Sequence, residues 1–186
     1  MIHEVIVTTR SISGEVHIAP MGIKMSETEV FISPFKPSQT LENLISQKEA
    51  VINFVDDVRV FAGIICKIKE DWPLTNLKDI KVPRLKNANT HYEVLVKNIV
   101  DDKTRPRVIC KILGESIHVP FRGFNRAQFS IIEASILISR LGMIPLDKIE
   151  GELQYLKIGL EKTSGEKEKE AWGWIQKRLN DFKKKI

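Results

Sequence analysis

Hydrophobic and polar residues alternate along much of the first two thirds of the chain, a pattern that is typical of β-strands with one buried face. The first ten residues place Val5, Val7 and Thr9 on alternate positions, and the alternation resumes at residues 16–18 after a turn that contains Ser and Gly. These two stretches predict a β-hairpin. Further short strands are predicted at residues 30–32, 51–55, 58–68, 92–100, 108–113 and 117–119.

Short strands joined by turns favour a barrel or a sandwich over a parallel sheet with crossover helices. One helix interrupts the strands, since an i, i+3, i+4 apolar pattern predicts it over residues 40–49, with Ser38 or Thr40 as the N-cap. Residues 72–89 contain two prolines and have mixed polarity. They are expected to form a loop with one helical turn at most.

Three amphipathic helices are predicted after the last strand. The first should bury a stripe formed by Phe129, Ile132 and Ile136. The second has Asp147 as its candidate N-cap, and the third begins near Gly165. Because such stripes must be buried on one another or on the strands, the helices are expected to pack on the strand-rich part as a single structural unit.

The predicted fold class is mainly β with α, with one inserted helix in residues 1–122 and a C-terminal helical segment in residues 123–186. The composition, 42% hydrophobic and 28% charged residues, is that of an ordinary globular protein. No apolar run approaches the about 20 residues of a membrane span, and no signal-peptide pattern precedes the first strand, so no membrane association is expected. With Cys66 and Cys110 as the only cysteines, a reduced, cytoplasmic protein is predicted, although one disulfide is compatible with the count.

The charge and the aromatic content argue against a nucleic-acid-binding protein. The net charge of 29 − 24 = +5 is compatible with anionic partners. The excess is spread along the chain apart from the lysines at 183–185, and aromatic residues make up only 7%. A mildly basic globular protein is therefore favoured over a nucleic-acid binder.

Common catalytic and metal-binding motifs are absent from the sequence. It contains no phosphate loop of the GxxxxGK[ST] type, no GxGxxG, no HExxH and no CxxC. The four histidines are scattered over strand-like segments without a nearby ligand, so we expect partly exposed histidines and no metal site. Both cysteines lie among apolar residues and are expected to be buried and inert. No catalytic residue can be named.

The segment from Ser33 to Leu44 has the features of an anion site. A strand ends before it, a loop with two prolines follows, and a helix then begins. Free N–H groups at a helix start attract anions, and Lys36, Ser38 and Thr40 add donors and a positive charge suited to a phosphate. Ordinary helix capping needs only one of these hydroxyls, and from the residues alone capping is favoured.

A second segment, residues 19–24, places Pro and Gly inside a predicted strand. Proline cannot donate to a sheet ladder, and glycine lets another backbone or a flat ligand come close. The alternative is a bulge at a barrel corner. The residues leave both interpretations open.

Together these segments resemble the FMN-binding split-barrel superfamily, which includes the flavin reductases and the pyridoxamine phosphate oxidases. They are most similar to its mostly archaeal branch, catalogued as domain of unknown function 447. The resemblance is carried by Ala-Pro-Met-Gly-Ile at 19–23, by the segment 33–44 and by Val-Ile-Asn-Phe-Val-Asp-Asp at 51–57. It continues through Arg-Gly-Phe-Asn-Arg-Ala at 122–127 and Glu-Lys-Thr-Ser-Gly at 161–165, and so covers nearly the whole chain.

The resemblance implies a six-stranded FMN-binding split β-barrel followed by a C-terminal helical segment. It also implies a homodimer with FMN in clefts at its interface, for which the apolar segments 51–55 and 58–65 are candidate surfaces. The loop and helix start would bind the flavin phosphate, while Met21-Gly22, which stands where flavin reductases often have Asn-Ser, would offer main-chain contacts to the ring. The implied cofactor-binding residues are Met21, Gly22, Ile23, Lys24, Ser33, Phe35, Lys36, Ser38, Gln39, Thr40, Asn43, Asn53 and Phe54.

The function implied by the resemblance is that of a flavin-dependent oxidoreductase or flavin reductase of unknown substrate, with NAD(P)H as the candidate hydride donor. Hydride uptake by a flavin requires no side-chain acid or base, which agrees with the lack of a catalytic motif. The alternative is a non-catalytic flavin-binding carrier or sensor. With the resemblance, a phosphate role for Ser38 and Thr40 outweighs capping alone, and one hydroxyl could serve each purpose.

Overall fold

The computed structural model describes residues 1–185, and the chain divides into two compact units. The first unit comprises residues 1–55 and 72–121, and the second comprises residues 56–71 and the chain from residue 122 onward. The helical segment predicted at 123–186 therefore belongs to a unit that also includes residues 56–71, while its last residue, Ile186, lies outside the described residues. Packing of the helices on the barrel stays a prediction.

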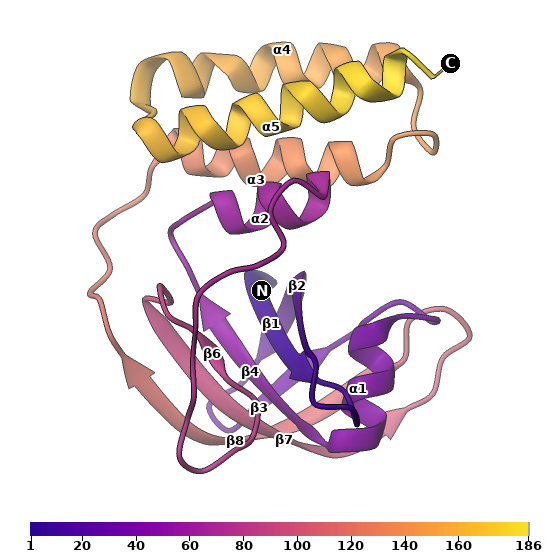
Figure 1. Ribbon diagram of the computed structural model, residues 1–186, viewed down its shortest axis with the longest axis vertical. Helices are drawn as coiled ribbons and strands as arrows, with labels where there is room; N and C mark the ends of the chain where they lie inside the picture. Colours follow the sequence, from indigo (N-terminus) through magenta and orange to yellow (C-terminus); the bar gives the residue numbers. More distant parts are fainter. Residues whose placement is uncertain (186) are drawn as a thin grey trace. The chain divides into compact units, whose positions relative to one another are not determined.

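The strands of the first unit close into a six-stranded barrel (Figure 1). In the order in which they neighbour one another, the strands are β1 (His3–Arg10), β2 (Val16–Met25), β3 (Glu29–Ile32), β8 (Arg107–Ile117), β7 (Thr90–Val100) and β4 (Glu49–Phe54). All neighbours are antiparallel, and β4 closes the barrel by pairing with β1. The barrel fold and the β1–β2 hairpin predicted from the sequence are confirmed.

The interior of the barrel is filled by alternate residues of its strands, as the sequence pattern predicts. Val5 and Val7 of β1 are fully buried there with Ile52 of β4. A helix, α1 (Gln39–Gln47), connects β3 to β4 and adds Leu41 and Leu44 to the same core. The helix predicted at 40–49 is thus confirmed, although it ends two residues earlier.

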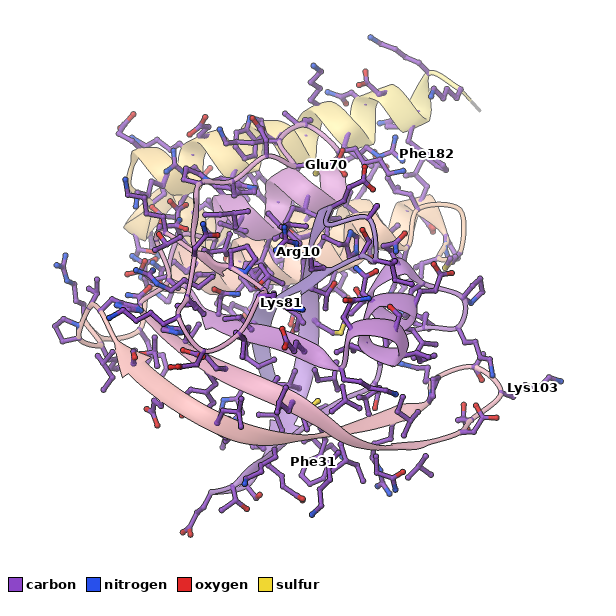
Figure 2. The ribbon with its side chains drawn as sticks, turned by 60° about the horizontal axis from the view of Figure 1, so that its bottom comes forward. Arg10, Phe31, Glu70, Lys81, Lys103 and Phe182 are labelled. Atoms are coloured by element: carbon purple, nitrogen blue, oxygen red, sulfur yellow. The ribbon has the colours of Figure 1, made fainter. Side chains whose placement is uncertain are left out.

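The outer face of β1 and β4 is covered by residues 72–89, here called the cover segment. Its two short strands, β5 (Leu74–Thr75) and β6 (Arg84–Leu85), pair with each other, so the predicted loop contains short strands rather than a helical turn. The Thr8 hydroxyl donates to the Pro83 carbonyl over 2.7 Å. The Arg10 guanidinium donates to the Lys81 carbonyl over 3.2 Å, and Figure 2 shows these two residues close together. These bonds hold the cover segment on the barrel.

The second unit is helical, with a core formed by α2 (Arg59–Cys66), α3 (Arg126–Ser139), α4 (Leu146–Thr163) and α5 (Glu166–Lys183). The strand predicted at 58–68 is wrong, because this segment forms α2. Val58, Ala62 and Cys66, spaced four residues apart, are all buried in the helical core. A short apolar run without clear alternation cannot be assigned to strand or helix from periodicity alone, and its β-branched residues favoured the strand.

The buried face of α3 also differs from the predicted one. Ala127 and Ile131 are fully buried, whereas Phe129, which begins the predicted stripe, is 56% exposed. Small residues are required where α3 meets α4, since a Cβ on Gly159 would lie 2.7 Å from the Ser130 hydroxyl oxygen. Close helix packing therefore selected the small-residue face of α3 over its bulkier apolar face.

The end of β8 and the starts of α4 and α5 can also be compared with the predicted elements. The separate strand predicted at 117–119 is wrong, because Ile117 is the last residue of β8. Asp147 lies in the first turn of α4 rather than at its N-cap, which is Pro145. Gly165 does cap α5, and its N–H donates to the Glu168 carboxylate over 2.9 Å. No helix within residues 1–185 combines the length and the apolar character needed to cross a bilayer.

Candidate functional site

The register between β2 and β3 brings the two sequence segments singled out above to one place. Ile32, the last residue of β3, pairs with Ile23 of β2. The chain therefore leaves the sheet beside residues 21–24 and runs through residues 33–40, here called the anion loop, into the start of α1. The predicted ring-contacting strand and the predicted phosphate loop are neighbours in the fold.

Free hydrogen-bond donors gather at the start of α1. The Ser38 hydroxyl accepts a bond from the Leu41 N–H over 3.3 Å, which makes Ser38 the N-cap. The N–H groups of Gln39 and Thr40 precede the first intrahelical donor, and no acceptor for them is found among the described residues. Such a helix start favours an anion.

Thr40 supplies a hydroxyl at the same point. Its side chain is 2% exposed, and no hydrogen bond of its hydroxyl is found within residues 1–185. Nε2 of His91 is the one fully buried side-chain N or O atom without a partner in residues 1–185, so the Thr40 oxygen, which is also unpartnered, still reaches solvent. Ser38 therefore takes the capping role that the residues alone favoured, and the hydroxyl of Thr40 remains available for a ligand.

Lys36 is held by the turn between β7 and β8, residues 101–106, here called the hairpin tip. Its ammonium donates to the Asp101 carboxylate over 3.1 Å, and its backbone N–H donates to the Thr104 carbonyl over 2.9 Å. Both side chains of the ion pair are exposed. Lys36 thus lies next to the helix start, as predicted, but it is paired with a carboxylate.

Arg105 of the hairpin tip is a residue of this region that the sequence analysis missed. Its Nη2 and Nε atoms donate to the Ser33 carbonyl over 3.1 and 3.3 Å, and its guanidinium lies 4.6 Å from the centre of the Phe35 ring. The backbone N–H groups of Arg105 and Thr104 donate to Asp102, and they hold the pKa of its carboxyl below the usual value. In sequence, this stretch signals only a turn.

Two predicted site residues, Gln39 and Asn43, have structural partners. Asn43 is buried, and its amide donates to the Thr9 hydroxyl over 3.0 Å. Its oxygen accepts a bond from the Gln39 amide over 2.9 Å. This chain fastens the first turns of α1 to β1 and so fixes where the helix start points.

The predicted ring-contacting strand has an open main-chain edge. β3 pairs with residues 23–25 of β2, so residues 18–22 pair with β1 alone, and main-chain groups on their other edge have no ladder partner among the described residues. Gly22 leaves room for two neighbouring side chains, because a Cβ there would lie 2.9 Å from the Ile2 side chain and 3.3 Å from the Glu4 carboxylate. A flat ligand at this edge would be contacted by main-chain groups, as predicted.

Asn53 and Phe54 do not join the other predicted residues within one chain, because β1 lies between β4 and β2. The Asn53 amide donates to the Ile6 carbonyl over 3.1 Å and its oxygen accepts a bond from the Leu85 N–H over 2.7 Å. Phe54 packs edge-on against Tyr92, with the ring centres 5.0 Å apart. Both side chains therefore have structural roles, and contact with a flavin stays a prediction.

A histidine pair lies beside Asn53 on the neighbouring strand. His91 pairs with Asn53 in the ladder, is 2% exposed, and its Nδ1 lies 2.8 Å from Nε2 of His118. Its own Nε2 has no hydrogen-bond partner in residues 1–185, and the Glu93 carboxylate is 3.6 Å away. Burial, with the nearby His118 and Arg84, lowers the pKa of His91 to about 4. The expectation of partly exposed histidines is wrong for His91.

The cysteines are free and buried, as the sequence predicts. Burial raises the pKa of Cys66 to about 11 and that of Cys110 to about 12, which makes both thiols poor nucleophiles. Within residues 1–185, no cluster of three or more His, Cys, Asp or Glu residues is arranged to hold a metal ion.

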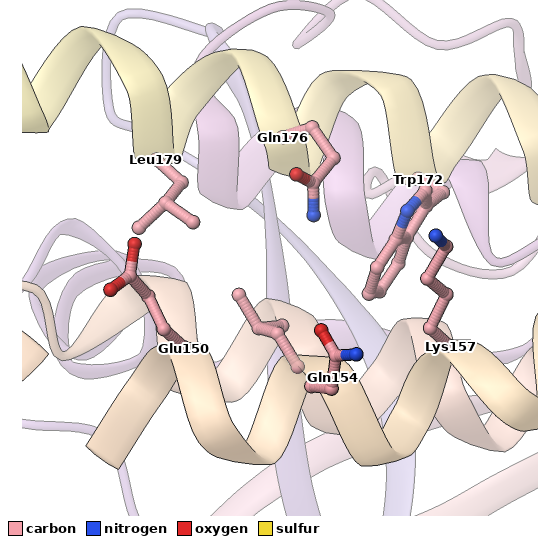
Figure 3. Close-up of a pocket in the computed structure, with 7 residues that line it drawn as sticks. Glu150, Gln154, Lys157, Trp172, Gln176 and Leu179 are labelled. Atoms are coloured by element: carbon pink, nitrogen blue, oxygen red, sulfur yellow. The ribbon is translucent and has the colours of Figure 1, made fainter. Parts of the chain in front are cut away.

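The second unit contains an open groove of about 320 Å³ between α4 and α5 (Figure 3). It is lined by Glu150, Leu153, Gln154, Lys157, Trp172, Gln176 and Leu179. Every polar side chain on this lining is at least partly exposed, and Glu150 is paired with Lys183 over 2.6 Å. Because it lacks a buried polar group, we assign the candidate site to the barrel.

Comparisons with known proteins agree with the resemblance seen in the sequence. A model described as "Protein of unknown function (DUF447) N-terminal domain" matches residues 3–119, and one described as "Protein of unknown function (DUF447)" matches residues 125–177. An uncharacterized protein of Methanocaldococcus jannaschii is 28% identical over 151 residues, which are 76% of this chain and 75% of that protein.

Solved structures with the same fold include flavin proteins. An FMN-bound protein of Methanosarcina mazei, assigned to the DUF447 model, aligns with a TM-score of 0.80 and 22% identity over 95% of this chain and 94% of that chain. Flavoredoxin from Methanosarcina acetivorans aligns with a TM-score of 0.54 and 12% identity over 63% of this chain and 69% of that chain. The styrene monooxygenase flavin reductase of Pseudomonas putida S12 aligns with a TM-score of 0.53 and 17% identity over 62% of this chain and 81% of that chain. At these identities, the likeness shows a shared fold.

Proposed function

Because the chain belongs to the DUF447 family, one of whose solved structures holds FMN, we propose that its barrel binds FMN and that the protein is a flavin-dependent oxidoreductase or flavin reductase. The observation that carries this proposal is the start of α1, where the hydroxyl of Thr40, without a hydrogen-bond partner in residues 1–185, adjoins two N–H groups that also lack one. A phosphate monoester matches this set of donors, and FMN carries one while riboflavin does not.

The residues present fit the cofactor. The helix start and Thr40 would hold the phosphate, with Lys36 as a nearby positive charge. The open edge of β2 at residues 18–22 would align the ring through main-chain groups. Bound FMN accepts a hydride or single electrons, and the protein supplies binding and orientation.

The proposal includes a homodimer. The open edge of β2 lies at the surface of one chain, and a second copy would complete a closed cleft over a flat ligand. The segments 51–55 and 58–65, predicted as the interface, are largely buried within the chain itself. Exposed apolar residues of the barrel unit, such as Ile117 and Phe35, are the better candidates. Light scattering that gave the 21.3 kDa of one chain at micromolar concentration would contradict the shared cleft.

A carrier or sensor without turnover is the second candidate function. Residues 21–24 and 33–43 include no histidine, cysteine or tyrosine, and their titratable side chains are Lys24, Lys36 and Glu42. Hydride uptake does not require an acid or base, and the two functions share the same binding site.

The deciding experiment begins with the absorbance spectrum of the purified protein and the mass of any released cofactor. Titration with FMN and riboflavin then tests the phosphate site, since FMN should bind at least about tenfold tighter if two to three charge-assisted bonds hold the phosphate. Anaerobic mixing with NADH and with NADPH separates the two functions, because only a flavin reductase would bleach the flavin within the time of turnover. A protein that binds neither flavin contradicts the proposal as a whole.

A further inference from the structure

We propose that the hairpin tip sets the affinity of the α1 start for a phosphate through two side chains of opposite charge, Arg105 and Asp101. The inference rests on the proposed FMN function and deepens it. It assigns to the tip a role in selecting a phosphate-bearing flavin over one without a phosphate. Arg105 raises that affinity, and Asp101 lowers it.

The tip is tied to the anion loop along its length. Arg105 binds the carbonyl of Ser33, and the Lys36 N–H binds the carbonyl of Thr104. The tip is itself fixed by Asp102, whose carboxylate accepts bonds from two successive backbone N–H groups over 2.9 and 2.7 Å. A rigid turn therefore determines the path of the loop that ends at the N-cap.

The charges of the tip are carried by side chains that contact the loop leading to the helix start. Lys36 is two residues before Ser38, so their Cα atoms are at most about 7 Å apart. Asp101 is 3.1 Å from the Lys36 ammonium, and Arg105 contacts the first residues of the same loop. The Debye length is about 10 Å at 0.1 M salt and about 30 Å at 0.01 M, so attraction of the phosphate by Arg105 and its repulsion by Asp101 should be strongest at low salt.

Asp101 opposes the phosphate in a second way, because it competes for Lys36. The Asp101 side chain is 80% exposed and that of Lys36 is 49% exposed, and ion pairs this exposed are weak. A phosphate carrying up to two negative charges can therefore take the ammonium from Asp101. In this exchange Lys36 breaks its ion pair with Asp101 and forms one with the phosphate. Without Asp101, the Lys36 ammonium could bind the phosphate without first breaking an ion pair.

Arg105 is anchored where it cannot make the same exchange. Two of its nitrogen atoms are bonded to Ser33 and its planar face lies on Phe35, so its charge stays beside the loop. No hydrogen bond of its Nη1 atom is found in residues 1–185, so the two N–H groups of Nη1 have no partner there. Arg105 thus adds both positive charge and rigidity to the loop.

The test compares FMN with riboflavin in wild-type protein and in Asp101→Asn, Arg105→Gln and Lys103→Gln. Lys103 is the matched control, because it is an exposed cation on the same tip that points away from the barrel (Figure 2). Dissociation constants from flavin fluorescence at about 0.05 M and about 0.5 M salt separate screened charge effects from structural ones.

We expect Asp101→Asn to tighten FMN binding about two- to fivefold and Arg105→Gln to weaken it by about three- to tenfold, with less than about a twofold change for Lys103→Gln. Riboflavin affinity should stay unchanged, and both effects should shrink at high salt. Arg105→Lys keeps the charge and should retain most of the FMN affinity.

Three results would overturn the inference alone: unchanged FMN affinity in both tip variants, equal changes for FMN and riboflavin, or an effect of Lys103→Gln as large as that of Arg105→Gln. Failure of wild-type protein to bind either flavin would overturn the proposed function as well. Thermal unfolding of each variant shows whether a loss of binding reflects a loss of folded protein.

Discussion

The anion loop and the barrel face beneath the cover segment are both rich in polar groups, but they differ in how many of these groups already have partners. Beneath the cover segment, Asn53 uses both its donor and its acceptor, and Thr8 bonds to Pro83. At the anion loop, two N–H groups and the Thr40 hydroxyl have no partner in the part of the chain that the structure describes. The polar groups beneath the cover segment that have partners stabilise the fold, whereas the unpartnered groups that converge at the anion loop are the candidates for binding a ligand.

This difference separates residues that the family resemblance groups together. Asn53 and Thr40 are both implied to bind the cofactor, and both side chains are buried. Only Thr40 has hydrogen-bonding capacity left. We therefore expect a polar side chain with protein partners to contribute to stability, and one without such partners to bind the ligand.

The largest effect is expected from Asn53→Ala, which breaks the contacts beneath the cover segment. The substitution removes the acceptor for the Leu85 N–H and the donor to the Ile6 carbonyl, and it leaves both groups buried. We expect a loss of about 3 kcal/mol in the free energy of unfolding, measured in urea. FMN affinity in the folded fraction should be unchanged, and a loss of FMN binding at full stability would instead place Asn53 in the ligand site.

Thr40→Val tests the other side of the comparison. The substitution keeps the shape of the side chain and removes only the unpartnered hydroxyl, so the stability of the apoprotein should change little. A bond to a charged group contributes about 1.5–3 kcal/mol, so FMN affinity should fall roughly 10- to 150-fold. Riboflavin is the control, and a variant that binds FMN as tightly as wild type would remove Thr40 from the phosphate site.

The third prediction concerns pH and the histidine pair. His91 has a folded-state pKa of about 4, below its unfolded value of about 6.5, so its contribution to stability is complete above pH 6.5 and is lost as the pH falls toward 4. Between pH 7 and pH 5 we expect the free energy of unfolding of wild-type protein to fall by about 1–2 kcal/mol. The range allows for the Glu93 carboxylate, which lies 3.6 Å from His91 and whose own pKa is raised by burial and by Asp79.

The measurement is urea unfolding at both pH values for wild-type protein, His91→Phe and His3→Phe. His91→Phe keeps a flat ring but cannot titrate, so it should lose less stability on acidification than wild type. His3→Phe, a change on β1, should behave as wild type. Equal pH dependence in all three proteins would assign the acid sensitivity to other groups.

The strands of the barrel could be predicted from local sequence patterns, whereas contacts between residues far apart in the sequence could not. Alternation between residues 1 and 18 is sufficient to predict the first hairpin, because alternate residues of a strand, such as Val5 and Val7, face the interior of the barrel. The segment 58–68 lacks such alternation, and only its burial among α3 and α5 makes it a helix. That burial depends on residues far away in the sequence.

The same limit applies to the site. The anion loop is one continuous segment, so its donors could be found by their order along the chain. Arg105 reaches the loop from a turn some 70 residues later, and no local pattern connects it to Ser33. Asn53 and Leu85 are 32 residues apart, and without that contact the amide appeared available for a ligand. Ser38 was ambiguous for a different reason, because capping and phosphate binding require the same hydroxyl.

The smallest effect is expected from Ser38→Ala, which distinguishes these two roles. The Ser38 hydroxyl already accepts a bond from the Leu41 N–H, so its loss should lower the free energy of unfolding by about 1 kcal/mol, as for other N-caps. FMN affinity in the folded protein should change by less than about threefold, because the free donors at Gln39 and Thr40 remain. Thr40→Val should show the reverse pattern in the same two assays. Ser38→Ala could instead weaken FMN binding as strongly as Thr40→Val and leave stability intact. A hydroxyl that already has a protein partner would then bind the ligand, and the distinction between partnered and unpartnered polar groups would be wrong for Ser38 and Thr40.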